Sequence, residues 1–342
     1  MKKLISLPGV LILISFIVSW NDGAQAQFCT TTVTATGSIQ DAVDAASLGD
    51  IICLDGTFSN VSTVTIATSD ITLKSASPAI LDGGVGPAFR LADGVSGVTI
   101  EDLEVKNRTG FRGGGVEAWD VSTSNITIRS NYMHDLEYNA VLVGSEGGFI
   151  HDNWMVKDNH VATVGFAGVE LTNCEDCSII HNEIDDAYLG VVVQARSTST
   201  TGIGMYDVVI NGVNVIGNMI MGSGIGIYAL SFTGHPTDFT PITDASTLLS
   251  NVNMSNNSIE SSGIGIFFWA YNDAATAKNG KITHNDIDCE DTGTGVRVSE
   301  SGSGQMGTVK NVKVVNNTFD ACDPTITDGG EDTKMPPWPF LP

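Results

Sequence analysis

Acidic, histidine and tyrosine side chains gather in turns near the middle of the chain, and these residue types can transfer protons. The candidates for acid–base chemistry and for neutralising a substrate charge are His134, Asp135, Tyr138, His160, Glu170 and Arg196. Elimination at a uronic acid needs a neutralised carboxylate, a base for the C5 proton and an acid for the leaving oxygen. Histidine and tyrosine suit the two proton transfers, and arginine suits the carboxylate. These residue types therefore favour a lyase or epimerase that acts on a uronate-containing polysaccharide.

Three further carboxylates offer another way to neutralise a substrate charge. Asp158, Asp185 and Asp186 form a candidate Ca²⁺ site, because calcium prefers oxygen ligands. Hydrolysis is an alternative chemistry, and it would need two carboxylates roughly 5–10 Å apart. Aspartate in a turn also commonly bonds the local backbone, so each of these residues has a purely structural alternative.

One pattern of residues, apolar-x-x-Asn-x-apolar, recurs along the chain. Its copies are Ile128–Met133, Ile150–Met155, Ile179–Ile184, Val215–Ile220, Met254–Ile259, Ile282–Ile287 and Val314–Phe319. Such repeats indicate a solenoid, in which each unit buries its apolar face only against its neighbours. Asparagine tolerates left-handed backbone at tight turns and can bond its counterparts along a stack. We therefore interpret the asparagines as structural and expect Ile128, Ile150 and Ile179 to stack on one axis.

A second segment, between these copies, alternates strictly between apolar and outward residues, as in Gly168-Val-Glu-Leu-Thr-Asn. A period of two indicates a strand with one buried face. Together the two segments predict an all-β, single-stranded right-handed parallel β-helix. Consecutive coils of such a fold lie about 4.8 Å apart. The turns that carry His134, His160 and Asp185 should then converge beside Glu170.

The outward residues of the second segment form a stripe that would face a ligand. The candidate substrate-binding residues on it are Glu117, Trp119, Gln194, Tyr228, Phe267 and Trp269. Aromatic rings pack well against the faces of sugar rings. Residues 195–212, 231–251 and 270–280 follow this segment, and they would form a wall of loops with His235 at a candidate gate. The alternative is that these loops simply cover the aromatic residues.

The N-terminus predicts export. Lys2 and Lys3 precede an apolar stretch from Leu4 to Trp20, and Ala24-Gln25-Ala26 resembles a cleavage site. This arrangement is typical of a secretory signal peptide, with a membrane anchor as the alternative. We expect a signal peptide (1–26), an N-terminal strand and capping helix (27–60), a β-helix of about ten coils (61–322) and an irregular tail (323–342). The helix, near residues 38–47, would cover the open end of the first coil.

Cysteine count and net charge narrow the class of protein further. Six cysteines in an exported chain suggest disulfides, and the local pairs would be 29–53, 174–177 and 289–322. For Cys174-Glu-Asp-Cys177, the alternative to a disulfide is a metal-binding or redox motif.

The net charge of −23 argues against nucleic acid as a partner, because binding nucleic acid requires a basic surface. We expect a secreted monomer, with no membrane span in the mature chain, whose partner is a polysaccharide.

The stretch "SIQDAVDAASLGDIICLDGTF", followed by "DITLKS" and repeats such as "NITIRSNYMHD", resembles the pectin-lyase-like superfamily of parallel β-helix repeat proteins. The resemblance covers about residues 36–322. It implies the fold and a range of functions: pectate, alginate and chondroitin lyases, polygalacturonases, mannuronan epimerases, tailspikes, adhesins and periplasmic metal-site assembly proteins. The chain has neither the Asn-Thr-Asp with a downstream Asp-Asp of polygalacturonases nor the Asp-Pro-His-Glu of the epimerases. No mechanism from these enzymes therefore carries over residue by residue.

A non-catalytic surface or periplasmic protein, which binds a glycan or another protein as an adhesin does, is the alternative to an enzyme. The chain has no complete catalytic signature, and the outer stripe carries no Lys or Arg between Glu117 and Gln194. A basic residue there would favour recognition of a uronate carboxylate. The sequence therefore predicts the fold more sharply than the chemistry.

Overall fold

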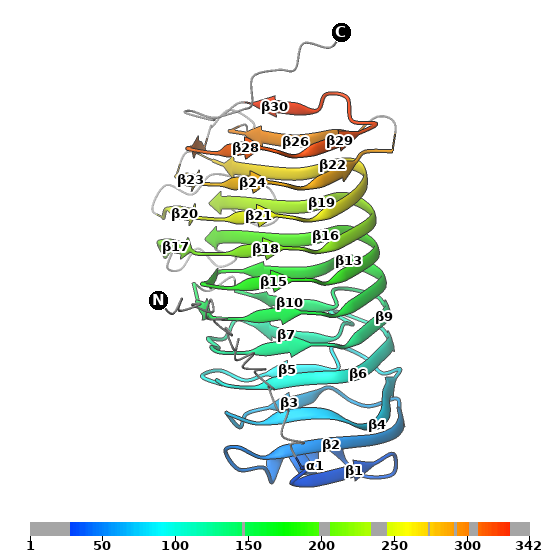
Figure 1. The fold of residues 1–342 in the computed structure, drawn as a ribbon. Helices are drawn as coiled ribbons and strands as arrows, with labels where there is room; N and C mark the ends of the chain where they lie inside the picture. The colour runs from blue at the N-terminus through cyan, green and yellow to red at the C-terminus, as the bar shows by residue number, and fades with distance from the viewer. Residues whose placement is uncertain are drawn as a thin grey trace, which may run out of the picture.

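The computed structural model describes residues 28–145, 148–197, 206–233, 245–272, 274–290, 293–300 and 307–328. Its strands stack along one axis into a right-handed parallel β-helix with a short helix at the N-terminal end (Figure 1). The predicted fold class is confirmed. The predicted signal peptide and the end of the tail lie outside the described residues. No helix among the described residues is long and apolar enough to cross a membrane.

Each coil contributes to three faces, which we number in chain order. Face one, before the recurring asparagine, contains β1 (Thr31–Thr34), β8 (Thr127–Arg129), β12 (Met155–Lys157), β15 (Ser178–Ile180), β18 (Asn214–Ile216), β21 (Asn253–Ser255), β24 (Lys281–Thr283) and β28 (Lys313–Val315). Face two, after it, contains β9 (Tyr132–Leu136), β25 (Asp286–Asp288) and β29 (Thr318–Asp320). Face three contains β3 (Val64–Ile66), β5 (Phe89–Leu91), β7 (Val116–Trp119), β10 (Val141–Gly144), β26 (Thr294–Ser299) and β30 (Ile326–Asp328).

Longer strands bend from one face onto the next. Three run from face one onto face two: β2 (Ile51–Ser59), β4 (Thr72–Asp82) and β6 (Thr99–Arg108). Four run from face two onto face three: β13 (His160–Thr172), β16 (Glu183–Ser197), β19 (Met219–Thr233) and β22 (Ser258–Tyr271). Short side sheets lie beyond face three: β11 (His151–Asp152) with β14 (Cys174–Glu175), and β17 (Val208–Asn211), β20 (Thr247–Ser250), β23 (Ala275–Lys278) and β27 (Thr308–Lys310).

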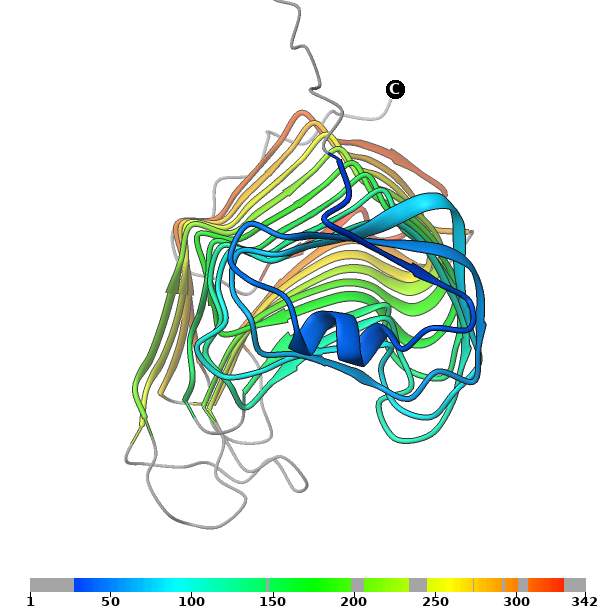
Figure 2. The same ribbon diagram turned by 90° about the horizontal axis from the view of Figure 1, so that it is seen from below.

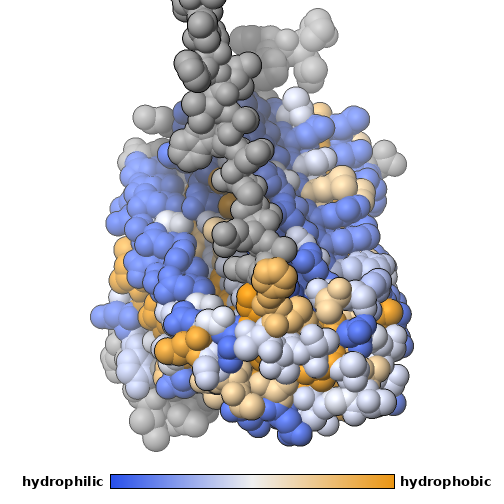
Figure 3. Space-filling model, turned by 60° about the horizontal axis from the view of Figure 1, so that its bottom comes forward, coloured by the Kyte–Doolittle hydropathy of each residue, from blue (hydrophilic) through white to orange (hydrophobic). Residues whose placement is uncertain are grey.

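The inward side chains of each face stack into aliphatic ladders. On face three Val141, Val169 and Val191 pair in successive strands, and all three are fully buried. The alternation predicts further inward residues on face three, and all of them are buried: Val116, Ala118, Val143, Leu171, Val193, Ile227, Ala229, Ile266, Phe268, Val296 and Val298. Burial of these ladders is the main favourable contribution to folding, at about 25 cal/mol per Å² of apolar surface. Hydrophobic side chains form only small groups on the outside at the N-terminal end (Figure 3).

Stacked asparagines hold the corner between face one and face two. The series is Asn131, Asn159, Asn182, Asn218, Asn257, Asn285 and Asn317. The Nδ2 of Asn182 donates to the main-chain oxygen of Val156 at 2.9 Å, one coil back. Its Oδ1 accepts from the main-chain N–H of Asn159 at 3.1 Å and from the Asn159 Nδ2 at 2.9 Å. Each amide therefore satisfies backbone groups that the turn would otherwise leave unpaired, in keeping with the predicted structural role.

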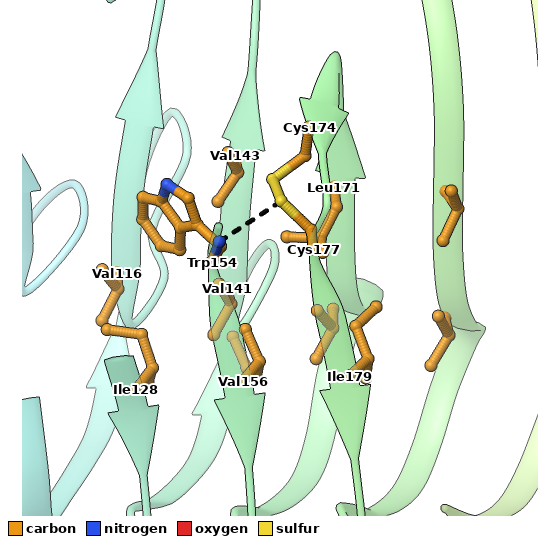
Figure 4. Close-up of a cluster of buried hydrophobic side chains, with 14 of the residues drawn as sticks. Val116, Ile128, Val141, Val143, Trp154, Val156, Leu171, Cys174, Cys177 and Ile179 are labelled. Atoms are coloured by element: carbon orange, nitrogen blue, oxygen red, sulfur yellow. Dashed lines mark hydrogen bonds between the residues drawn. A yellow bond between two sulfur atoms is a disulfide. The ribbon is translucent and has the colours of Figure 1, made fainter. Parts of the chain in front are cut away.

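One coil has a different register from the one predicted. Val156, not Ile150, stacks between Ile128 and Ile179 (Figure 4). The ladder asparagine of this coil is Asn159, 28 residues after Asn131 and 23 before Asn182. The pattern fits both Ile150–Met155 and Val156–Val161, so spacing alone did not separate them. Asn153 instead occupies the corner that leads into face one, where its Nδ2 donates to Asn125 Oδ1.

Several predicted site residues have left-handed backbones at corners of the β-helix. Asp158 and His181 come directly before ladder asparagines, with φ of 54° and 53°. Asp135 and Asp186 have φ of 53° and 55° at the corner between faces two and three. Short polar side chains tolerate this region because they can bond the local backbone. The three aspartates therefore have a structural reason to be where they are.

The places of His151, His181 and His284 in the repeat segment, next to the asparagine, predict outward structural side chains, and this prediction is wrong for His151, which is buried. Its Nδ1 lies 2.8 Å from Thr123 Oγ1, and its Nε2 donates to the Gly144 oxygen at 3.3 Å. Burial lowers the pKa of this imidazole to about 4. His181 and His284 do face outward, as predicted.

The capping helix α1 (Ile39–Asp44) lies across the first coil (Figure 2). Ser38 is its N-cap, and the Ser38 hydroxyl accepts from the Asp41 N–H at 3.1 Å. Ile39 and Val43 are buried against the end of the β-helix, as the sequence predicted.

All three predicted disulfides form, Cys29–Cys53, Cys174–Cys177 and Cys289–Cys322. Disulfides are typical of oxidising compartments, and the Cys174–Cys177 bond lies inside the core (Figure 4).

The asparagine ladder predicts a difference between two variants that match the same sequence pattern. Asn182→Ala should lower the free energy of unfolding by about 3 kcal/mol, because buried backbone groups on two coils lose their partners. Asn153→Ala should cost only about 1 kcal/mol, mainly for alanine in a left-handed backbone. Chemical denaturation measures both values. Equal losses would contradict the assignment of Asn159 rather than Asn153 to the ladder.

Candidate functional site

The predicted site residues fall into two separate groups. Tyr138, Glu170 and Arg196 line one cavity on face three, together with Trp119, Gln194 and Tyr228 from the predicted stripe. We call this cavity the aromatic pocket. His134 and His160 lie on the outside of face two with neighbouring acidic residues, a group described below as the histidine cluster. The predicted convergence of these histidines beside Glu170 is therefore wrong.

The bend in β13 explains the separation. His160 pairs with Tyr132 and Glu183 on face two, whereas Glu170 pairs with Leu142 and Val192 on face three. The strand changes register between Val164 and Ala167, so the two ends of β13 belong to different faces. Stacking brings together residues that occupy the same position in successive coils. His160 and Glu170 occupy positions on different faces, so stacking does not bring them together.

The aromatic pocket has a volume of about 460 Å³. Its walls come from the outward columns of face three and from the segment before β7. The lining residues are Phe111, Arg112, Trp119, Tyr138, Leu142, Phe166, Glu170, Leu189, Val192, Gln194, Arg196, Tyr228, Leu230 and Phe232. The volume and mixed lining suit one or two sugar rings, since ligand sites combine apolar walls with few polar groups.

Glu170 is the one carboxylate among the described lining residues, and it is 4% exposed. Asn139 Nδ2 donates to its Oε2 at 2.8 Å, and Gln194 Nε2 and the Thr172 hydroxyl donate to its Oε1 at 2.9 and 3.2 Å. These donors and Arg196 favour the ionised form, but burial outweighs them and raises the pKa of Glu170. A carboxyl with this environment holds its proton at a higher pH than an exposed glutamate does, which makes it a candidate for proton transfer.

Two arginines bring positive charge to the pocket. Arg196, predicted from the sequence, follows Gln194 on β16, and its Nε is buried with no hydrogen-bond partner in the part of the chain that the structure describes. Arg112 was missed, because it precedes β7 and does not belong to the stripe. Its guanidinium lies 4.3 Å from the centre of the Trp119 ring and 3.6 Å from the Glu117 carboxylate. The stripe itself carries no Lys or Arg between Glu117 and Gln194, as the sequence indicated, but Arg112 brings a positive charge beside it from outside the strands.

Tyr138 and its neighbours form an aromatic wall. The rings of Tyr138 and Phe166 stack at 5.4 Å, and Phe166 stacks with Tyr188 at 6.3 Å. Burial, followed by the negative charge of Glu170, raises the pKa of Tyr138, while Arg112 and Arg196 act in the opposite direction. The phenol is therefore kept protonated and can donate a proton.

The rest of the predicted stripe lies beside the pocket. Glu117 is buried and paired with Arg90 at 3.1 Å as well as with Arg112. Phe267 and Trp269 stack on each other at 5.0 Å and contact Tyr228 at 5.4 and 6.2 Å. They do not line the pocket but extend its aromatic surface towards later coils. Much of the predicted loop wall, with His235, lies outside the described residues.

The histidine cluster consists of Tyr132, His134, His160, Glu183 and Asp185. Tyr132 lies between the two imidazoles, with ring centres 4.2 Å from His134 and 4.7 Å from His160. Outside the cluster, His134 lies 2.7 Å from Asp135 and 3.3 Å from Glu104. His160 Nε2 lies 3.3 Å from Asp185 Oδ2.

The predicted Ca²⁺ ligands do not come together among the described residues. Asp158 lies 3.8 Å from His181 at its corner, and Asp186 lines a shallow groove with Asp135. Asp185 instead belongs to the histidine cluster, with its ligand oxygen within 4.8 Å of those of His160 and Glu183. Calcium as a cofactor stays a prediction, but the three-aspartate site proposed for it is wrong.

Comparisons with known proteins identify the fold. A family model described as a right-handed β-helix region matches residues 51–244. No curated protein matches the chain in sequence. The chain is similar in structure to the Streptococcus pneumoniae surface protein and adhesin PfbA, at 13% identity over 90% of this chain and 82% of that chain, with a TM-score of 0.53.

Two enzymes of known structure have lower TM-scores. A polygalacturonase from Erwinia carotovora ssp. carotovora is 13% identical over 90% of this chain and 96% of that chain, with a TM-score of 0.46. The A-module of the mannuronan C-5 epimerase AlgE4 from Azotobacter vinelandii is 13% identical over 87% of this chain and 95% of that chain, with a TM-score of 0.45. At these identities the similarities concern the fold and not the activity.

The raised pKa of Glu170 predicts how pH affects stability. Folding favours the protonated carboxyl, so this group contributes stability below its ordinary pKa of 4.5 that is lost as pH rises through the raised value. The stability of the native protein should therefore fall relative to that of Glu170→Gln between pH 4 and pH 7. Urea denaturation across this range measures the difference. Glu260→Gln, which removes an exposed carboxylate, is the control, and an opposite slope for Glu170→Gln would contradict the burial argument.

Proposed function

The chain belongs to the right-handed β-helix family, and we propose that its aromatic pocket binds an acidic sugar of a polysaccharide and cleaves the chain there by β-elimination. The observation that carries this proposal is Arg196, whose buried Nε has no hydrogen-bond partner among the described residues and which lines the same cavity as Glu170 and Tyr138. A buried donor without an acceptor costs free energy, and a ligand carboxylate would supply the acceptor.

The two arginines would bind and neutralise the carboxylate of the sugar. Arg112 is already shared with Glu117, so Arg196 has the greater capacity for a new anionic partner. Neutralising the carboxylate makes the C5 proton more acidic, because negative charge develops on the carboxylate as that proton leaves. The protein carries a net charge of −23, so this local positive charge is needed for an anionic ligand.

The aromatic residues would position the sugar ring. Trp119, Tyr228 and Phe232 line different parts of the pocket, and Phe267 and Trp269 continue the aromatic surface. Sugar C–H groups pack on aromatic faces, and these contacts hold the ring in one orientation relative to Glu170. The later aromatic residues would serve neighbouring sugars of the same chain.

The proton transfers are assigned to Glu170 and Tyr138. Glu170 in its ionised form accepts the C5 proton, and the electron pair of the C5–H bond forms the C4–C5 double bond. The C4–O bond breaks, and the Tyr138 hydroxyl donates a proton to the leaving oxygen. A proton then passes from Glu170 to Tyr138 through solvent, which restores both groups.

Hydrolysis fits the pocket less well than elimination, and epimerisation is the closest alternative. Hydrolysis needs two carboxylates that face the bond, and Glu170 is the only one among the described lining residues. Epimerisation would share the first step but would return a proton to the opposite side of C5. Tyr138 and Tyr228 both line the pocket as neutral phenols, and either reaction could use one of them as its acid, so product analysis separates elimination from epimerisation.

A panel of polygalacturonate, alginate and chondroitin tests the proposal, because elimination creates an unsaturated uronate that absorbs ultraviolet light. The native protein should produce this absorbance with at least one of the three. Tyr138→Phe should reduce kcat by about 10²–10⁴ with little change in binding. Arg196→Gln should weaken binding and turnover together.

The double variant His134→Gln/His160→Gln is the matched control, since these histidines lie outside the pocket, and its turnover should stay within about twofold of native. Binding that depends on Arg196 without any turnover by the native protein would contradict elimination and would favour a glycan-binding protein. Loss of activity in the histidine variant would contradict the location of the site.

The raised pKa of Glu170 also predicts the pH profile of the reaction. Glu170 must be ionised to accept a proton, so kcat should fall on acidification at a pH above the ordinary glutamate value of 4.5. The profile of kcat against pH at saturating substrate measures this. An acidic limb at or below pH 4.5 would contradict Glu170 as the base.

A further inference from the structure

The outside of face two carries a group of side chains that the proposed reaction does not use. His160, Glu183 and Asp185 each offer one ligand atom, and these atoms lie within 4.8 Å of one another. From this geometry we infer that the three residues bind a divalent transition metal of the zinc type. The inference concerns a different face from the aromatic pocket and does not depend on the proposed reaction.

The sheet itself sets the geometry of the three ligands. Glu183 and Asp185 are two residues apart on β16, so both side chains point to the same side of the sheet. His160 on β13 pairs directly with Glu183 in the neighbouring strand. Two alternate residues of one strand and the opposite residue of the next strand form a triangle of side chains. The strands β9, β13 and β16 are stacked in the middle of the β-helix, so this triangle rests on rigid backbone (Figure 1).

The carboxylates in this triangle lack the cations that usually balance such groups. The ion pair recorded for Asp185 is the one with His160, and neither Glu183 nor Asp185 pairs with a Lys or Arg among the described residues. The second oxygen of Asp185, Oδ1, is buried and has no hydrogen-bond partner among the described residues, while the side chain as a whole is 29% exposed. An acceptor in this position costs free energy unless a cation or donor reaches it.

The imidazole of His160 is held in place by its neighbours. It stacks on Tyr132 at 4.7 Å, and its Nε2 faces Asp185 Oδ2 at 3.3 Å. The separation between this nitrogen and oxygen is close to that of two ligands on one tetrahedral metal with bonds of about 2.0–2.2 Å. The site is partly exposed, with 42% of the His160 side chain accessible, so an ion can enter.

The ligand set favours zinc over calcium. Imidazole nitrogen is a good ligand for zinc and other transition metals, whereas calcium takes six to eight oxygen ligands. One neutral imidazole and two carboxylates balance a charge of +2. Three protein ligands leave a fourth position for water, as in zinc sites that are not purely structural.

Isothermal titration of EDTA-treated protein with Zn²⁺ tests this inference, with Ca²⁺ titrated in parallel. We expect one Zn²⁺ per chain, bound at least tenfold more tightly than Ca²⁺. His160→Gln and Glu183→Gln should each weaken Zn²⁺ binding at least tenfold. Co²⁺ should give a visible absorption band with the native protein that is lost in His160→Gln.

His181→Gln is the matched control, because His181 and Asp158 form a similar pair at 3.8 Å to which the described residues add no third ligand. Its Zn²⁺ affinity should equal that of the native protein, and circular dichroism checks that every variant is folded. Absent Zn²⁺ binding, binding unaffected by His160→Gln and Glu183→Gln, or equal affinity for Ca²⁺ would each overturn the inference.

Discussion

The contact between consecutive coils at the asparagine corner is the interaction on which the rest of this structure depends. Each asparagine side chain bonds backbone groups of the preceding coil, as Asn182 does with Val156 and Asn159, so it fixes where one coil sits on another. A slip of one residue would turn the inward ladder outward. Once this corner is fixed, faces two and three follow in register. Residues as distant in sequence as Trp119 and Tyr228 then line one cavity.

The same stacking explains which features the sequence could predict. Inward ladders such as Val141, Val169 and Val191 are repeated at every coil, so the repeats reinforce one another and the fold is readable. The outward columns follow from the same register, which is why Glu170 and Tyr228 were correctly placed on one stripe. The error at Ile150 arose because asparagine occupies two corners of the same coil, the corner that leads into face one and the corner between faces one and two. Both Asn153 and Asn159 satisfy the pattern, and the tertiary spacing decides between them.

Chemistry was harder to predict because it depends on features that do not repeat. Arg112 reaches the pocket from a segment before β7, and nothing in its spacing relates it to the stripe. The bend in β13 moved His160 away from Glu170, and a bend of this kind leaves only a weak signal in an apolar–polar pattern. Asp135, Asp158 and Asp186 were attractive as catalytic or metal residues, yet their left-handed backbones give them a local purpose. A clue to these positions exists in the repeat, since Asp135 and Asp186 each come four residues after a ladder asparagine and Asp158 comes one residue before one.

Charge imposes a final constraint on any acidic ligand. The net charge of −23 creates a repulsive field, but salt screens that field within about 8 Å at physiological ionic strength. Contacts inside the aromatic pocket act over much shorter distances in a less polar environment, where screening is weak. Arg196 and Arg112 can therefore hold a carboxylate even though the whole protein repels it. Moderate salt should then speed the approach of an acidic polymer without releasing it, the opposite of what a broad basic surface would do. The pocket thus needs only two well-placed guanidinium groups on an acidic scaffold.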